Sequence, residues 1–346
     1  MWSEDMRLTR RQSIMAALAG STMALTPRAF AAGEGSYKGK SIDLIIGFPP
    51  GGSNDFYSRA LVAHLPQYIT DTPTIIPRNM PGAGSLSAAA HMYSIAPKDG
   101  TSIAIMAPTI PLDERLGTVA GRFKSSEFGW IGRANSLVNV IFVRSESIAN
   151  IDEAFTKSVR LAATGAGSAV TIFPNSLNKI MGTRFDLIKG YGGSAEGMLA
   201  VDRGEVEGHC TGWDTLKASH PDWLKSGKIR ILVQFAAQRH PELPDVPTAV
   251  ELAKTDHDRA LLTAIVNASE IGISFFTTPG APADRLATLR TAFSACMKDA
   301  GFKSDLAKLT LGLNPLSGED VAARVADVAK VPDSLIPDLK NAYSSA

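Results

Sequence analysis

The chain has 346 residues, of which 45% are hydrophobic and 20% are charged, and its formal net charge at pH 7 is +1. This length is enough for about two globular domains of ~150 residues each. The near-neutral charge provides no basic surface for nucleic acid or for an anionic membrane, so neither is expected as a partner.

The N-terminal segment has the pattern of an export signal. Basic residues precede an apolar run at 14–25, which is too short to span a bilayer. Ala29-Phe30-Ala31 follows with the small residues of a cleavage site. We therefore expect residues 1–31 to be a signal peptide that is cleaved near Ala31.

The paired Arg10 and Arg11 are typical of a twin-arginine signal, although Ser13 stands where that signal usually has an apolar residue. Either export route therefore stays open. Since no cysteine lies near the cleavage site to carry a lipid, we expect the mature protein to be free in the periplasm.

Beyond the signal, short apolar runs alternate with helical patterns. This alternation predicts an α/β fold in which parallel sheets carry helices on both faces. The strand candidates, in chain order, are residues 42–46, 74–76, 103–106, 139–143, 161–163, 185–188, 229–235 and 271–276.

Several segments between and after these strands have apolar residues at helical spacing. The spacing predicts helices around Tyr57, Leu61, Leu65 and Tyr68, around Phe173, Leu177, Ile180 and Met181, over 284–296, around Leu306 and over 318–328. Pro174 should make its helix begin late or kink. Pro332 and Pro337 should mark a loose C-terminal tail.

Glycine-rich loops follow three of the apolar runs. In the first, Gly51-Gly52 precedes Ser53-Asn54-Asp55, and a helix that begins there would direct free N–H groups towards an anion. Similar loops occur at residues 79–85 and 164–168. Each alone could be an ordinary strand-to-helix turn without a ligand, but together they suggest one pocket for a carboxylate or phosphate.

The motifs of common enzyme classes are absent from the sequence. There is no G-x-S-x-G elbow, H-E-x-x-H or Walker lysine, and neither G-x-G has the third glycine of a dinucleotide site. We therefore expect no metal and no cofactor. His209 lacks partners at metal-ligand spacing and is expected at the surface or at a pocket edge. Cys210 and Cys296 are expected to be buried and unpaired.

The order of the motifs resembles that of the solute-binding receptors of tripartite tricarboxylate transporters, the TctC or Bug family. The resemblance covers about residues 42–328 and rests on Phe48-x-Pro50-Gly51-Gly52-x-x-Asp55, Asn79-x-Pro81-Gly82-Ala83-Gly84, Ala96-Pro97-x-Asp99-Gly100, Gly165-x-Gly167-Ser168, Tyr191-x-Gly193, Gly204-Glu205-Val206-Glu207-Gly208 and Leu243-Pro244-Asp245-Val246-Pro247-Thr248. Met80 departs from the arginine common in the family, and segment 208–214 is bulkier than usual.

The resemblance implies a two-lobed periplasmic binding protein fold of type II, in which each lobe is a mainly parallel sheet flanked by helices and the ligand lies in a cleft between the lobes. Lobe one would hold residues 37–136 and 271–346, and lobe two residues 137–270. The implied function is capture of a small organic carboxylate by a monomer and its delivery to membrane subunits of the TctA/TctB type.

The resemblance also implies roles for individual residues. N–H groups of Gly51, Gly52, Ser53 and Asn54 would bind the ligand carboxylate, Asp55 would brace their loop, and Pro81, Gly82 and Ala83 would form a wall. Opposing donors would come from Thr164, Gly165, Ala166, Gly167 and Ser168, with Ser194 at another helix start. Asp214 would face the distal end of the solute or cap a helix. Phe48 and Trp213 would flank the ligand or pack in the core.

Two other functions stay open at the level of sequence. An exported enzyme could hold a phosphorylated or acyl substrate in the same loops, although no nucleophile has a base at recognisable spacing. A sensor that presents its solute to a membrane histidine kinase would use the same fold. The solute could be a di- or tricarboxylate, an aromatic acid or an acidic amino acid.

Overall fold

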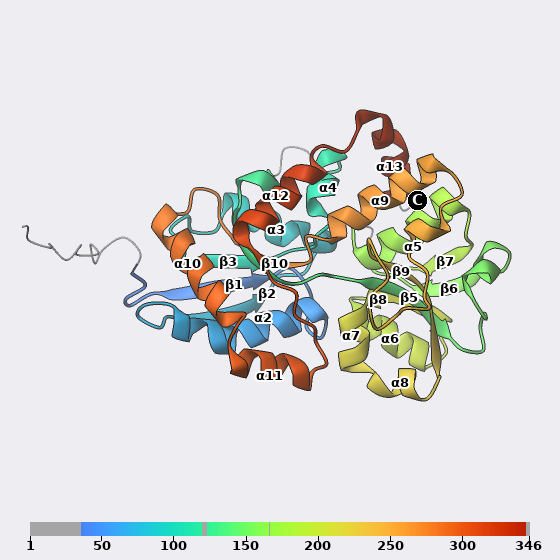
Figure 1. Ribbon diagram of the computed structural model, residues 1–346, viewed down its shortest axis with the longest axis horizontal. Helices are drawn as coiled ribbons and strands as arrows, with labels where there is room; N and C mark the ends of the chain where they lie inside the picture. Colours follow the sequence, from blue (N-terminus) through green and yellow to red (C-terminus); the bar gives the residue numbers. More distant parts are fainter. Residues whose placement is uncertain (1–35, 120–122, 166, 344–346) are drawn as a thin grey trace, which may run out of the picture. The chain divides into compact units, whose positions relative to one another are not determined.

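Two β-sheets with helices packed against them form the chain over residues 36–119, 123–165 and 167–343, which are those that the computed structural model describes (Figure 1). The predicted signal peptide, residues 1–31, lies outside the described residues. The first sheet has six strands in the order β11 (Leu316–Ser317), β4 (Gly129–Asn135), β10 (Ile273–Thr277), β3 (Ser102–Ile105), β1 (Ser41–Ile46) and β2 (Thr74–Asn79). The second has five, in the order β7 (Phe185–Ile188), β6 (Val159–Ala162), β8 (Gly208–Gly212), β5 (Asn139–Arg144) and β9 (Ile229–Phe235).

Both sheets are mixed. In the first sheet β1 pairs in parallel with β2 and β3, whereas β10 runs antiparallel to β3 and β4. In the second, β6 pairs in parallel with β7 and β8, whereas β5 runs antiparallel to β8 and β9. The sheets are therefore less parallel than predicted, because β5 and β10, where the chain passes from one sheet to the other, run against their neighbours.

Helices connect the strands and cover the sheets. The α-helices are α2 (Ser53–His64), α3 (Leu86–Ser94), α4 (Ile110–Arg115), α5 (Ala169–Met181), α6 (Ser194–Asp202), α7 (Trp213–Ser219), α8 (Pro221–Lys225), α9 (Asp256–Ser269), α10 (Ala283–Cys296), α11 (Ala300–Lys308), α12 (Gly318–Val328) and α13 (Ile336–Tyr343). Short 3-10 turns are η1 (Leu65–Tyr68), η2 (Ala83–Ser85), η3 (Ser125–Glu127), η4 (Ile151–Phe155), η5 (Val250–Leu252) and η6 (Asp333–Leu335).

The strand β1 shows how the sequence builds the core. Leu44 and Ile46 are fully buried in one cluster with Tyr57 and Leu61 of α2, while the intervening Ile45 belongs to a second cluster on the other face. Alternate side chains of a strand point to opposite faces, so a continuous apolar run indicates a strand that is covered on both sides. Each such side chain stabilises the fold by about 1.5–3 kcal/mol.

Each predicted strand coincides with a strand of the structure, and β4, β8 and β11 were missed. The segment of β8, Gly-His-Cys-Thr-Gly, has no run of β-branched residues, although all five of its residues are buried. The segment of β4 contains two glycines and a buried charged residue, Arg133. Tertiary burial rather than local propensity makes these segments strands.

Two predicted helices differ from those of the structure, and α4, α8 and α9 were missed. The helix around Phe173 begins at Ala169, before Pro174, and its N-cap Ser168 accepts a hydrogen bond from the Val170 N–H at 3.2 Å. A late start is therefore ruled out. The pattern that continued to Tyr68 is divided in two, because α2 ends before the 3-10 turn that contains Pro66.

The expectation of a loose C-terminal tail was wrong. Residues 336–343 form α13, in which Leu339 is fully buried, and α13 packs against α5 (Figure 1). The Asn175 side-chain amide also donates to the Ala342 carbonyl oxygen at 2.8 Å. Apolar residues at helical spacing after Pro337 outweigh the two prolines. The predicted lobe boundaries stay a prediction, and both α12 and α13, from segment 271–346, contact helices assigned to lobe two.

Cys210 and Cys296 are buried free thiols, as expected. Burial raises the pKa of both thiols, that of Cys296 to about 12. The placement of His209 at a surface or pocket edge was wrong. Its ring is fully buried, with Nδ1 at 2.9 Å from the Ala162 carbonyl oxygen, and burial lowers its pKa to about 4.

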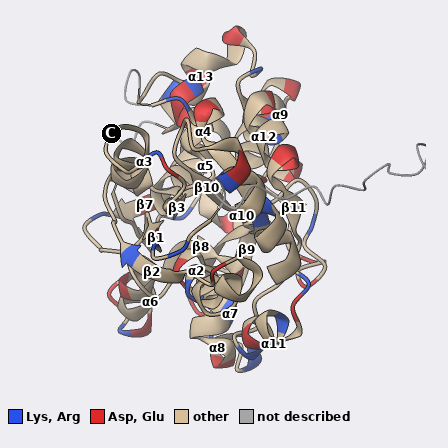
Figure 2. Cartoon of the chain, turned by 90° about the vertical axis from the view of Figure 1, so that its left-hand side faces the viewer, with Lys and Arg blue, Asp and Glu red and all other residues tan. Residues whose placement is uncertain are grey.

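Charged side chains are distributed over the helices without a separation of signs. Figure 2 shows basic and acidic residues interspersed, as on α11, which carries Lys303, Asp305 and Lys308. Within the described residues, the helices are too short or too polar to cross a membrane.

Candidate functional site

A cavity of about 380 Å³ lies where loops of the two sheets meet. Its walls follow the carboxyl ends of β1, β2 and β3 in the first sheet and of β6, β7 and β8 in the second. This edge is where α/β sheets usually bind ligands. At ~30 Å³ for each water-sized group, the volume suits a ligand of about a dozen non-hydrogen atoms.

Three helices begin in the cavity wall. Ser53 starts α2, Ser168 and Ala169 start α5, and Ser194 starts α6. The first N–H groups of a helix have no partner within the helix, and each N-terminus carries about half a positive charge. Three N-termini around one small cavity therefore favour an anion.

The cavity wall carries no charged side chain among the residues that the structure describes. Polar side-chain atoms of four lining residues have no hydrogen-bond partner among the described residues: Asn54 Oδ1, Ser85 Oγ, Asn139 Nδ2 and Thr164 Oγ1. Such atoms are uncommon in folded proteins because each costs ~1–3 kcal/mol. Each of the four is itself buried, so these atoms do not face the open space of the cavity.

The first glycine loop is held in place by Asp55. Its carboxylate accepts hydrogen bonds from the Gly51 N–H at 3.2 Å, from Arg59 Nε at 3.0 Å and from Asn79 Nδ2 at 3.0 Å. Burial by itself raises the pKa of Asp55, but these donors together lower it below its ordinary value. The carboxylate therefore stays ionised and fixes the loop.

Loops from the two sheets touch beside the cavity. The Ser53 N–H donates to Thr215 Oγ1 at 2.8 Å. A Cβ on Gly84 would overlap the Gly167 carbonyl oxygen, and Gly84 has a φ of 66°, so this contact requires glycine for two reasons. The cavity is thus closed on one side by direct backbone contact.

A family model for TctC, the tripartite tricarboxylate transporter family receptor, matches residues 67–340. The chain belongs to this family. It is also 25% identical over 342 residues to the UPF0065 protein in the gbd 5'region of Cupriavidus necator, covering 95% of this chain and 96% of that protein.

Two solved structures show that the TctC chain has the same fold as other periplasmic binding proteins. The periplasmic binding protein BugD superimposes with a TM-score of 0.68 at 22% identity, over 88% of this chain and 98% of BugD. MatC from Rhodopseudomonas palustris, with bound malate, gives a TM-score of 0.64 at 19% identity, over 84% and 98% of the two chains. The two-lobed type II fold is thereby confirmed.

Most residues predicted for the site line the cavity of this TctC receptor. They are Phe48, Gly52, Ser53, Asn54, Pro81, Gly82, Ala83, Thr164, Gly165, Ser168 and Ser194. Gly51, Asp55, Gly167, Trp213 and Asp214 do not line it, and Ala166 lies outside the described residues. The N–H groups of Gly51 and Ser53, expected to bind the ligand, donate within the protein instead.

Trp213 is a core residue and not a wall of the site. It is 6% exposed, packs in a cluster with Val140 and Leu216, and its Nε1 donates to Glu242 Oε2 at 2.6 Å. Trp213 is the first residue of α7, and its side chain lies away from the cavity. The structure therefore supports the alternative in which Trp213 packs in the core. Trp213 gives no reason to expect a bulky ligand.

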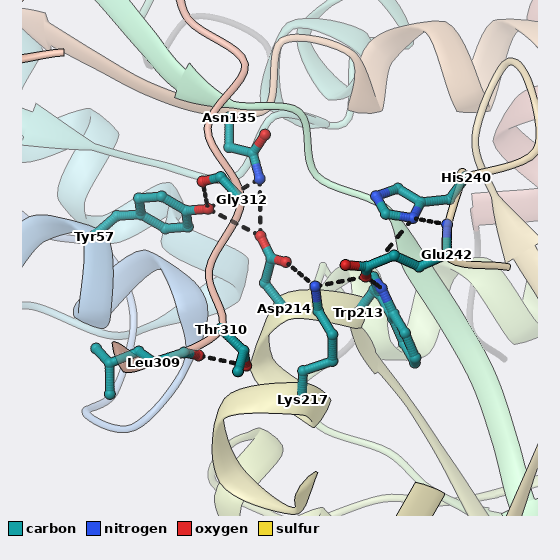
Figure 3. A network of polar contacts seen from close by, with 10 residues as sticks. All are labelled: Tyr57, Asn135, Trp213, Asp214, Lys217, His240, Glu242, Leu309, Thr310 and Gly312. Carbon is teal, nitrogen blue, oxygen red and sulfur yellow. Dashed lines mark hydrogen bonds and ion pairs between the residues drawn. The ribbon is translucent and has the colours of Figure 1, made fainter. Parts of the chain in front are cut away.

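Asp214 belongs to a buried polar network that joins α2 to α7, drawn in Figure 3. Its carboxylate accepts from the Tyr57 hydroxyl at 2.9 Å and from Asn135 Nδ2 at 2.8 Å, and it pairs with Lys217 at 3.3 Å. The Tyr57 hydroxyl also lies within hydrogen-bond distance of the Gly312 carbonyl oxygen. Burial, and secondarily the Asp214 charge, raises the pKa of Tyr57. We call these residues the Tyr57–Asp214 network.

Some lining residues were missed by sequence reasoning. Gly192 and Gly193 precede Ser194 and repeat the Gly-Gly-Ser sequence of residues 51–53, but only Ser194 of this loop was predicted to belong to the site. Ser85, Leu137, Asn139 and Thr215 also line the cavity. Asn139 is the first residue of β5, and nothing in the surrounding sequence distinguishes it from an ordinary strand residue.

Proposed function

We propose that this TctC-family receptor binds a small organic carboxylate in the cavity between its two sheets and catalyses no reaction. The observation that carries the proposal is the convergence of the N-termini of α2, α5 and α6 on a cavity whose described wall has no charged side chain. An anion is the ligand that these helix ends stabilise. The effect is largest at α5, because Asp55 and Glu196 already place a carboxylate in the first turn of α2 and of α6.

The chemical make-up of the wall supports binding over catalysis. Ser85, Thr164 and Ser168 line the cavity, but no His, Cys, Asp, Glu or Lys stands among its described residues to act as a base. The part of the chain that the structure describes also has no cluster of residues able to hold a metal ion. A hydroxyl without a base is a hydrogen-bond partner rather than a nucleophile.

The proposal extends to location and partners. Residues 1–31 would direct the chain to the periplasm, where a monomer would deliver its ligand to membrane subunits of the TctA/TctB type. Support comes from the family description as a transporter receptor and from the export pattern of the sequence. The likeness to MatC, which carries malate, supports a carboxylate of similar size.

The test is isothermal titration of the purified protein with malate, succinate, citrate, adipate, benzoate and glutamate. We expect saturable binding of at least one acid, with a rise in melting temperature, since a ligand at a hundred times its dissociation constant adds about 2.7 kcal/mol of stability. Absence of binding for every acid, or turnover of one of them, would refute the proposal.

A further inference from the structure

Loops of the two sheets meet at two points beside the cavity. Pro49 follows β1 and lies against Gly193, which follows β7, and a Cβ on Gly193 would lie 2.7 Å from Pro49 Cγ. Gly84 follows β2 and lies against Gly167, which follows β6, and a Cβ on Gly84 would overlap the Gly167 carbonyl oxygen. Real Cβ atoms essentially never come within 3.0 Å of an atom to which they are not bonded, so each contact needs a glycine.

Both points lie far from the segment that joins the sheets between β4 and β5. In the first sheet β1 is the third strand from β4, and in the second sheet β7 is the third strand from β5. Since neighbouring strands are about 4.8 Å apart, three spacings place the Pro49–Gly193 contact about 14 Å from that segment. The Gly84–Gly167 contact follows β2 and β6, which are four and two strands away.

This distance decides which contacts change when a two-lobed binding protein opens. The lobes turn about the segments that join them, so the displacement of a contact grows with its distance from those segments. The Tyr57–Asp214 network lies beside the joint, because Asn135, the last residue of β4, donates to Asp214 at 2.8 Å. The two glycine contacts lie further out and therefore separate more.

We propose that the Pro49–Gly193 and Gly84–Gly167 contacts form when the lobes close over the ligand, and that Gly84 and Gly193 set how long it is retained. The inference rests on the proposed carboxylate-binding function and adds the residues that control release. The apparent affinity of a receptor falls with the fraction of molecules that can adopt its binding-competent state. A side chain at either glycine would collide across its contact and lower that fraction, so every acid should dissociate faster.

The two glycines differ in what an alanine would test. Gly193 has a φ of 179°, which any residue can adopt, so Gly193→Ala introduces the collision with Pro49 without straining the backbone. Gly84 has a φ of 66°, at which an alanine is also strained. Gly227 has the same φ, and a Cβ there would meet no atom within 4 Å. Gly227→Ala is therefore the matched control for Gly84→Ala, with the strain but without the collision.

The experiment measures rate constants and dissociation constants by surface plasmon resonance for each acid that binds the natural protein. Gly193→Ala and Gly84→Ala should each raise the dissociation constant at least about tenfold, mainly through faster dissociation, because an added methyl group overpacks the contact. The factor should be the same for small and large acids, since the methyl group meets the protein and not the ligand. Gly227→Ala should bind as the natural protein does.

A second substitution identifies the cause of the loss at position 193. Pro49→Ala removes the ring atom that a Cβ there would meet, so Gly193→Ala should cost much less affinity when Pro49→Ala is also present. Pro49→Ala should not restore Gly84→Ala, whose collision is with Gly167. Loss of the glycine N-cap of α6 would weaken binding equally with and without the proline ring.

The outcomes separate the two proposals. If Gly84→Ala does not fold, Gly193→Ala and its rescue still decide the matter. Natural dissociation rates in the folded variants, a loss that grows with the size of the acid, or a loss that Pro49→Ala leaves unchanged would overturn this inference while leaving carboxylate binding intact. Failure of every acid to bind the natural protein would overturn the proposed function and this inference with it.

Discussion

The cavity and the Tyr57–Asp214 network are both buried, and both bring together segments attached to the two sheets, but their polar groups are in opposite states. In the network, the Asp214 carboxylate has Tyr57, Asn135 and Lys217 as partners. In the cavity wall, no charged side chain stands among the described residues, and the N-termini of α2, α5 and α6 converge there. The difference teaches that the network balances its charge within the protein, whereas the helix ends at the cavity favour an anionic ligand.

The first way to break this comparison is to fill the cavity. Gly52 has a φ of −109°, which any residue can adopt, and a Cβ there would meet no atom within 4 Å. The valine of Gly52→Val should therefore occupy ligand space and weaken binding at least about a thousandfold, or ~4 kcal/mol. Titration with the best-bound acid measures this loss.

Two controls accompany the Gly52 test. Gly52→Ala adds one methyl group and should weaken binding much less than valine. The free energy of unfolding of the valine variant should fall by less than about 1 kcal/mol, since only a cap preference is lost. If Gly52→Val binds the acid as tightly as the natural chain does, the ligand binds at another site.

A second test concerns His209, whose ring is buried outside the cavity and whose Nε2 has no hydrogen-bond partner among the described residues. Its pKa falls from 6.5 to about 4 on folding because burial disfavours the charged ring. As the pH falls, the ring therefore takes up a proton in the unfolded chain before it does so in the folded chain. The free energy of unfolding decreases as the pH falls from 6.5 towards 4. The loss should be on the order of 3 kcal/mol.

His209→Asn keeps a donor for the Ala162 carbonyl oxygen and removes the titration, so urea unfolding of both proteins between pH 7 and 4 isolates the effect. Both proteins also contain Asp113, whose pKa is raised to about 7 by burial, so its contribution to stability grows as the pH falls, opposite to that of His209. The difference in unfolding free energy between the two proteins therefore isolates the effect of His209. Affinity for the acid should be unchanged at pH 7. A constant difference in unfolding free energy across this range would contradict a neutral buried ring.

A third test removes one contact of the Tyr57–Asp214 network. Tyr57→Phe deletes the hydroxyl that donates to Asp214 or to the Gly312 carbonyl oxygen. The free energy of unfolding should fall by about 1.5–3 kcal/mol, the usual cost of losing a hydrogen bond to a charged group. Because Tyr57 does not line the cavity, the choice between malate and succinate should not change. A changed preference would make the network part of the binding site.

Sequence reasoning reached the strands, the glycine loops and the family, because these depend on local patterns. The run at β1 and the Gly51-Gly52 turn needed no tertiary information. It failed where long-range packing decides: β8 is a strand because it lies between β5 and β6, and Asp214 faces Tyr57, which is 157 residues away in the chain. The position of Trp213 next to Asp214 likewise gave no sign of which side of α7 the indole occupies.

The most direct test of the central claim compares a threonine that lines the cavity with a buried threonine that does not. Thr164 Oγ1 is buried at the cavity without a partner, whereas Thr277 Oγ1 donates to the Ser102 carbonyl oxygen at 2.8 Å, away from the cavity. Without ligand, Thr164→Val should leave the free energy of unfolding unchanged or raise it by up to about 1 kcal/mol, while Thr277→Val should lower it by about 1 kcal/mol. With the best-bound acid, only Thr164→Val should weaken binding. Equal destabilisation by the two valines, together with natural affinity in Thr164→Val, would contradict a ligand site at this cavity.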